Sequence, residues 1–110
     1  MNQERVLTKH LDDFLLCLEE GRYYDAHEAL EIIWFPRRFE DDNEMRLLKG
    51  FINASVSLEL KKRGKKEASQ KVWKTYLKYK PLIYKIDSPH LKKYYKITQY
   101  LDKFCYNSIY

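Results

Sequence analysis

The sequence predicts an all-α fold, a compact single-domain antiparallel bundle of about five helices. Apolar residues recur at helical spacing through most of the chain, and no stretch of strict alternation is long enough to suggest a strand. Only three glycines and three prolines interrupt this pattern in 110 residues, which leaves short connections. Short connections favour antiparallel neighbours, and a chain of this length supports one hydrophobic core. The expected domain spans residues 1–110.

The first two helices are predicted before a polar connector at residues 37–43. The first covers about residues 3–20, and Gly21 supplies its stop. The second runs from Tyr23 to Phe35, and Pro36 ends it because proline cannot donate a hydrogen bond into a continuing helix. The inward stripe of the first helix comprises Leu7, His10, Leu11, Phe14, Cys17 and Leu18.

The third helix is predicted to begin with Asp42 or Asn43 as its cap and to end at Gly64. Its inward stripe comprises Met45, Leu48, Phe51, Ile52, Ser55 and Leu58. Three small residues on the same helix predict that another helix approaches it closely: Gly50, Ala54 and Ser57.

Two further helices complete the bundle. The fourth begins near Lys65, and Pro81 either ends or kinks it. Ser88 suits the cap and Pro89 the first position of the last helix, which covers about residues 88–107. The residues expected to face inward are Ala68, Val72, Tyr76 and Tyr79 in the fourth helix and Leu91, Tyr94, Tyr95, Thr98, Leu101 and Cys105 in the last.

Composition indicates a cytoplasmic protein. No apolar run approaches the roughly 20 residues of a membrane span, and residues 1–5 lack the basic-then-apolar layout of a signal peptide. Cys17 and Cys105 lie far apart in sequence and belong to no Cys-x-x-Cys pair. A disulfide between them would join the first helix to the last, but a cytoplasmic location favours two reduced core thiols.

The formal net charge of +5 permits attraction to acidic partners. Lysines and aromatic rings interleave at residues 71–80, as they do on surfaces that bind nucleic acid. The same text describes an amphipathic helix whose tyrosines cover the edge of the core and whose lysines are solvated. This second interpretation is favoured, and nucleic-acid binding stays as an alternative.

One segment places titratable side chains on a hydrophobic helical face. His27, Glu31 and Trp34 follow one another at spacings of four and three, which stacks them along one side of a helix. On a helical wheel His27 lies near the apolar centre, Glu31 lies at its border and Glu28 faces away. Burial of an unpaired carboxylate costs several kcal/mol, so Glu31 is expected to have a donor, a cation or water beside it.

The third helix adds a second inward carboxylate, Glu59. If the two helices pack face to face, His27, Glu31 and Glu59 converge, with His10 as a fourth member. Such a set could hold a divalent metal, Zn²⁺, Mn²⁺ or Fe²⁺, through imidazole and carboxylates, or could carry out acid–base chemistry. It could equally be a hydrogen-bonded network that fixes helix register, and this structural interpretation is favoured.

Neighbouring residues suggest a ligand pocket beside this cluster. Tyr24 and Trp34 could line such a pocket or belong to the core. Arg38, with Arg37 before it, could hold an anionic ligand at the pocket mouth or pair with the acidic residues at 40–42. The acidic neighbours favour pairing.

Two motifs resemble domain-of-unknown-function family 309, small all-helical and mostly prokaryotic proteins. The first is Tyr24-x-x-His27-Glu28-x-x-Glu31-x-x-Trp34, and the second is the stretch at residues 48–53, followed by Gly64. The resemblance covers roughly residues 14–80. It implies the helical fold and the position of a site, but no activity, since none is assigned to the family. Lys49 and Asn53 replace the family's usual glutamines, and Glu59 stands where relatives often carry histidine.

Two functions from different classes follow. The favoured one is a binding or structural module, a homodimer in one version, whose polar cluster stabilises the fold. The alternative is a metal-dependent or acid–base enzyme with its site at His27, Glu31 and Glu59 and with Arg38 near the substrate. The last helix, which lies outside the family-like portion, offers tyrosines that suit an interface.

Overall fold

Five α-helices account for most of the computed structural model, which describes the backbone of residues 2–109 and the side chains of residues 5–104. Within residues 2–109 no strand occurs, so the predicted all-α class is confirmed. Two short 3₁₀ segments, η1 and η2, follow the second and fourth helices. The bounds are α1 Asn2–Glu19, α2 Tyr23–Trp34, η1 Phe35–Arg37, α3 Asn43–Lys62, α4 Lys66–Tyr79, η2 Lys80–Lys85 and α5 Leu91–Ile109.

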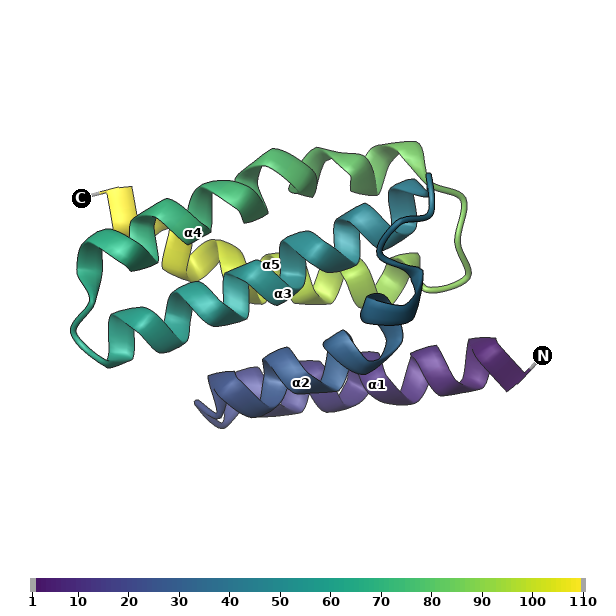
Figure 1. The fold of residues 1–110 in the computed structure, drawn as a ribbon, viewed down its shortest axis with the longest axis horizontal. Coiled ribbons are helices and arrows are strands. Elements are labelled where there is room, and N and C mark those ends of the chain that lie inside the picture. The colour runs from purple at the N-terminus through teal and green to yellow at the C-terminus, as the bar shows by residue number, and fades with distance from the viewer. Residues whose placement is uncertain (1, 110) are drawn as a thin grey trace.

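The helices form two antiparallel hairpins with α5 behind them (Figure 1). α1 pairs with α2 in one hairpin and α3 pairs with α4 in the other, and α2 lies against α3. α5 lies behind α3, where the rings of Phe51 and Tyr94 have centroids 5.8 Å apart. This order leaves one long seam between α2 and α3, and the candidate site residues lie along it.

The central helix of the bundle is α3. All six residues of its predicted stripe are buried, and Leu47, Ala54 and Ser57 on other faces are buried as well. A helix covered on two sides needs small residues at the closest approach. A Cβ placed on Gly50 would stand 3.0 Å from the Cβ of Tyr79, so the predicted close approach is confirmed and α4 is the helix that makes it.

Turn residues set the helix ends that the sequence predicts. Gly21 and Gly64 have φ values of +75° and +81°, a left-handed conformation that glycine adopts without strain. Asp42 caps α3, and its carboxylate accepts a hydrogen bond from the backbone N–H of Glu44 at 2.8 Å. Pro36 and Pro81 are each the second residue of a 3₁₀ segment, η1 and η2, that directly follows an α-helix, so α2 and α4 both end just before these prolines.

The buried face of α4 differs from the prediction. Ala68 is exposed, and Val72 and Tyr79 are half-buried. Tyr76 is buried as predicted, and the other buried positions are Ser69 and Trp73. Contacts with α3 fix which residues of α4 lie deepest: Ser57 donates to the carbonyl of Ser69 at 2.6 Å, and Ser69 donates to the carbonyl of Ser57 at 2.8 Å.

The last helix begins at Leu91, later than predicted. Ser88 accepts a hydrogen bond from the backbone N–H of His90 and donates one to Glu44 of α3, so residues 88–90 form a turn fixed to α3. Tyr95, expected inward, is 40% exposed, while Ile97 takes a core position. Of the two thiols predicted to be reduced core residues, Cys17 is free and buried, whereas the side chain of Cys105 lies outside the described residues.

The helices of the described residues also bear on a membrane location. None of them combines the length and the apolar character that crossing a bilayer requires.

Candidate functional site

A pocket of about 340 Å³ opens between α2 and α3. We call it the His27 pocket, and its lining residues are Tyr23, Tyr24, His27, Val56, Glu59, Leu60 and Arg63. Three of the residues singled out in the sequence, Tyr24 and His27 of α2 and Glu59 of α3, therefore line one pocket. Aromatic rings and aliphatic side chains supply the remaining wall, a composition typical of sites for small molecules.

His27 is held by its own helix. Its Nε2–H donates to Oε2 of Glu31 at 3.1 Å, one turn further along α2. The His27 side chain is 21% exposed and that of Glu31 is 42% exposed, so the carboxylate lies on the solvent side of the ring. This bond leaves Nδ1 without a protein partner among the described residues. A ring fixed in this way can accept a hydrogen bond or a proton at Nδ1.

Glu59 is held in the same manner on the opposite wall. Its Oε2 accepts a hydrogen bond from Nε of Arg63 at 2.6 Å, again one turn along the helix. The Glu59 side chain is 19% exposed, whereas that of Arg63 is 60% exposed. The ion pair therefore runs from the interior of the pocket to its mouth. Oε1 of Glu59 stays free to accept a further hydrogen bond.

The predicted four-membered cluster divides into separate pairs. Within the described residues no hydrogen bond joins His27 or Glu31 to Glu59. His10 lies between α1 and α2, where its Nδ1–H donates to the carbonyl of Ala29 at 2.8 Å. A network that fixes the register of α2 on α3 would need bonds across the seam, so each pair acts chiefly within its own helix.

A metal centre at His27, Glu31 and Glu59 stays a prediction. In the part of the chain whose side chains are described, no three His, Cys, Asp or Glu side chains are arranged so that they could share an ion. Glu31 bonds His27 rather than pointing with it into the His27 pocket.

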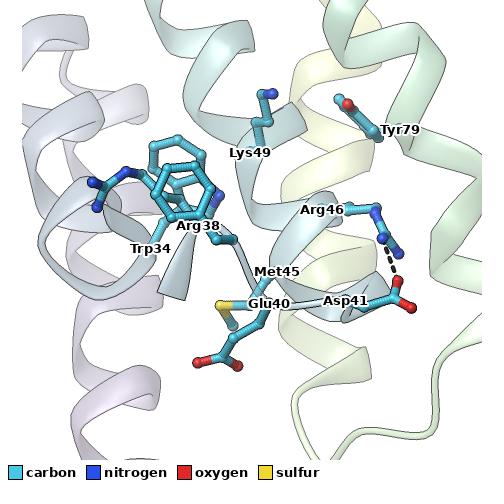
Figure 2. A pocket seen from close by; sticks show the side chains of 9 residues that line it. Trp34, Arg38, Glu40, Asp41, Met45, Arg46, Lys49 and Tyr79 are labelled. Carbon is cyan, nitrogen blue, oxygen red and sulfur yellow. Dashed lines mark hydrogen bonds and ion pairs between the residues drawn. The ribbon is translucent and has the colours of Figure 1, made fainter. Parts of the chain in front are cut away.

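The other predicted pocket residues lie at the opposite end of the α2–α3 seam. Trp34 and Arg38 line a second pocket of about 320 Å³ with residues of α3 and α4 (Figure 2). We call it the Arg38 pocket, and its lining residues are Trp34, Arg38, Phe39, Glu40, Asp41, Met45, Arg46, Lys49 and Tyr79. Tyr24 belongs to the His27 pocket, where its ring centroid is 5.9 Å from that of His27.

Several lining residues were missed by reasoning from the sequence. One of them is Arg63, although its position four residues after Glu59 is a usable signal for an ion pair. Val56 and Leu60 gave no signal of their own, because an aliphatic residue on a helix serves a core and a pocket equally.

A buried polar network joins α3 to the start of α5, and the sequence did not predict it. Ser88 and Tyr94 both donate to Oε2 of Glu44, the serine at 2.7 Å. Burial, together with the Glu44 carboxylate, raises the pKa of the Tyr94 hydroxyl well above its usual range. Nearby, Nδ1 of His90 lies 3.4 Å from Oγ1 of Thr8. The network locks α5 onto α3.

Comparisons with known proteins identify the family of this chain. Neither the curated proteins nor the solved structures give a match to this chain. The sequence model of one family, Domain of unknown function (DUF309), matches residues 11–72. The match covers α2, all of α3 and therefore both walls of the His27 pocket. The chain belongs to the DUF309 family.

Proposed function

We propose that this protein is a small-molecule binding module whose His27 pocket takes an amine with an apolar body. One observation carries the proposal: His27 and Glu59 line a single pocket from opposite helices, while each is held by a partner on its own helix. The ligand therefore has no need to order either side chain, which lowers the entropic cost of binding.

The chemistry of the free atoms defines the class of ligand. Nδ1 of His27 and Oε1 of Glu59 are both hydrogen-bond acceptors, so they complement a donor. An ammonium group also gains from the Glu59 charge and from the ring faces of Tyr23 and Tyr24. The remaining wall, Val56 and Leu60, suits an apolar body.

Benzylamine is a suitable probe of this proposal. We expect it to shift the backbone amide resonances of Val56 and Leu60 in a saturable way in two-dimensional NMR, while benzoate leaves them unchanged. Glu59→Gln removes the charge and should weaken binding by about tenfold. Glu28→Gln is the matched control, since Glu28 is exposed on the outer face of α2. Equal affinity for the Glu59→Gln and wild-type proteins contradicts the proposal.

A second candidate function rests on how charge is distributed along the chain. Residues 65–110 contain eleven lysines against three carboxylates, whereas residues 1–64 contain ten basic and thirteen acidic residues. Of the lysines whose side chains are described in this half, Lys80 and Lys93 pair with carboxylates. Tyr84 is 75% exposed beside Tyr95, with ring centroids 6.4 Å apart. Lysines around exposed rings suit single-stranded nucleic acid.

Single-stranded RNA oligonucleotides test this candidate by fluorescence anisotropy. A lysine-driven complex weakens steeply as salt rises, and Tyr84→Ala should weaken it further by removing a stacking surface. Phe39→Ala is the control, since Phe39 is an exposed ring in the connector between α2 and α3. Binding that does not change with salt contradicts the candidate.

Location and self-association stay predictions from the sequence. A cytoplasmic homodimer is consistent with an exposed Tyr95 on α5, while Tyr94 of the same helix is committed to the core. Sedimentation velocity over a hundredfold range of concentration measures the association state.

A further inference from the structure

We infer that the Arg38 pocket is a separate binding site for a small organic anion that carries a flat ring. Its position differs from that of the His27 pocket, and so does its chemistry. Three cations line it, Arg38, Arg46 and Lys49, together with three aromatic side chains. Its volume of about 320 Å³ suits a single ring with one anionic substituent.

Arg38 is fixed in place without a carboxylate. Its guanidinium carbon lies 3.6 Å from the ring centroid of Phe35 and 4.5 Å from that of Phe39. Nη1 donates to the carbonyl of Phe35 at 2.6 Å. Stacking of this kind holds the flat faces of the guanidinium, while its remaining N–H groups stay free at the edge. These groups match the two oxygens of a carboxylate or phosphate.

Among the described residues Arg38 has no acidic partner, although four carboxylates follow within six residues. Arg37 pairs with two of them, Glu40 at 2.9 Å and Asp42 at 3.1 Å. Arg46 pairs with Asp41. The last, Glu44, accepts the buried hydrogen bonds from Ser88 and Tyr94. Each acid, including Glu40 and Asp41 in the wall of the pocket itself, is thus engaged with a partner other than Arg38, and Figure 2 draws an ion pair at Arg46 and none at Arg38.

Lys49 supplies a second uncompensated charge in the same pocket. Among the described residues it pairs with no carboxylate, and its ammonium lies 5.7 Å from the ring centroid of Tyr79. Lys49 projects from the buried helix α3 and is half-buried. Arg38 and Lys49 thus bring two positive charges without acidic partners to the wall of one pocket, and an anion bound there compensates them. The ring of the ligand then has Trp34 and Tyr79 beside it.

This inference goes beyond the proposed function and does not depend on it. The His27 pocket offers acceptors to a cationic group, whereas the Arg38 pocket offers donors to an anionic one. No residue lines both pockets. One set of variants therefore tests each pocket separately.

Phenyl phosphate is the probe, followed by NMR on the indole N–H of Trp34. We expect a saturable shift with phenyl phosphate and with benzoate, a weaker response to inorganic phosphate, and none with benzyl alcohol. This series separates the contribution of the charge from that of the ring. A shift of equal size with benzyl alcohol would show that the pocket binds the aromatic ring without recognising the charge, and would overturn the inference.

Variants locate the anion. Arg38→Gln and Lys49→Gln should each weaken phenyl phosphate by about tenfold, as expected for loss of one charged hydrogen bond. Arg63→Gln is the matched control, because it removes a cation from the mouth of the His27 pocket, and it should leave the affinity unchanged. Far-UV circular dichroism checks that each variant is folded. Wild-type affinity in folded Arg38→Gln and Lys49→Gln proteins, or no binding to the wild type, refutes the site.

Discussion

Tyr94 shows at the scale of single residues how a buried hydroxyl couples folding to pH. It is fully buried and donates to Glu44, and both features favour the neutral phenol. Its pKa in the folded protein is therefore raised above the ordinary value of 10.0. The unfolded chain loses this proton first as pH rises, so the folded state binds more protons above about pH 10.

We predict that the contribution of Tyr94 to the free energy of unfolding is complete below about pH 10. Above that pH it falls, by up to about 1.4 kcal/mol per pH unit. Tyr94→Phe should be less stable at neutral pH by about 1–3 kcal/mol, because it leaves Glu44 short of a donor. The difference between the two proteins should narrow above pH 10. Urea unfolding between pH 8 and 11 measures this, with the exposed Tyr84→Phe as control.

The contribution of His27 to stability is also set by one side chain. Its hydrogen bond to Glu31 joins two residues of the same helix, and such a pair stabilises a helix by about 0.3–0.5 kcal/mol. We predict that His27→Ala lowers the free energy of unfolding by less than about 1 kcal/mol and weakens benzylamine binding. A loss of several kcal/mol in urea unfolding would instead restore the interpretation that His27 holds the fold together.

At the scale of elements, the contact between α3 and α4 depends on small residues. A Cβ on Gly50 would lie 3.0 Å from the Cβ of Tyr79, closer than an ordinary van der Waals contact, and Ser57 and Ser69 bond each other's carbonyls further along the same contact. Helix propensity alone favours alanine over glycine by about 1 kcal/mol. For Gly50→Ala, helix packing therefore predicts a loss of stability and helix propensity predicts a gain.

We predict that Gly50→Ala lowers stability by about 1–3 kcal/mol, because the two helices must move apart to admit the methyl group. Urea unfolding of the variant measures whether the free energy of unfolding falls or rises. Gln70→Ala, at an exposed position of α4, is the control and should change stability by less than about 0.5 kcal/mol. A Gly50→Ala protein that is more stable than the wild type contradicts the close contact.

At the scale of the whole molecule, one core draws on every α-helix. The buried cluster includes Leu11 of α1, Leu30 of α2, Phe51 of α3, Tyr76 of α4 and Leu101 of α5. α5 lies outside the residues that the family model matches, yet Tyr94, Ile97 and Leu101 of that helix are fully or almost fully buried. The family-like portion is therefore completed by α5 rather than independent of it.

The single domain predicted over residues 1–110 can be tested with the two tryptophans. Trp34 reports on α2 and Trp73 on α4. In the Trp34→Phe and Trp73→Phe proteins, the fluorescence of the remaining tryptophan should change at the same urea concentration as the far-UV circular dichroism. A fluorescence midpoint well apart from the circular dichroism midpoint in either variant would mean that the two hairpins unfold separately.

The sequence by itself determined the helices, most of the inward faces and the family. These follow from local signals: glycine and proline at the ends, apolar spacing in α1 and α3, and two motifs. Local signals did not show that Ser69 and Trp73 of α4 lie deepest, because hydrogen bonds with α3 hold Ser69 there. They also did not show that a side chain of α3 fixes the turn at residues 88–90.

The tertiary structure alone decided what the polar residues do. Spacing could not tell whether His27, Glu31 and Glu59 form a shared cluster or two pairs within separate helices. It also could not show that Arg38 has no acidic partner among the described residues while four acids close by are engaged. Hydrogen bonds and ion pairs form between atoms a few ångströms apart, and those distances are set only when helices pack.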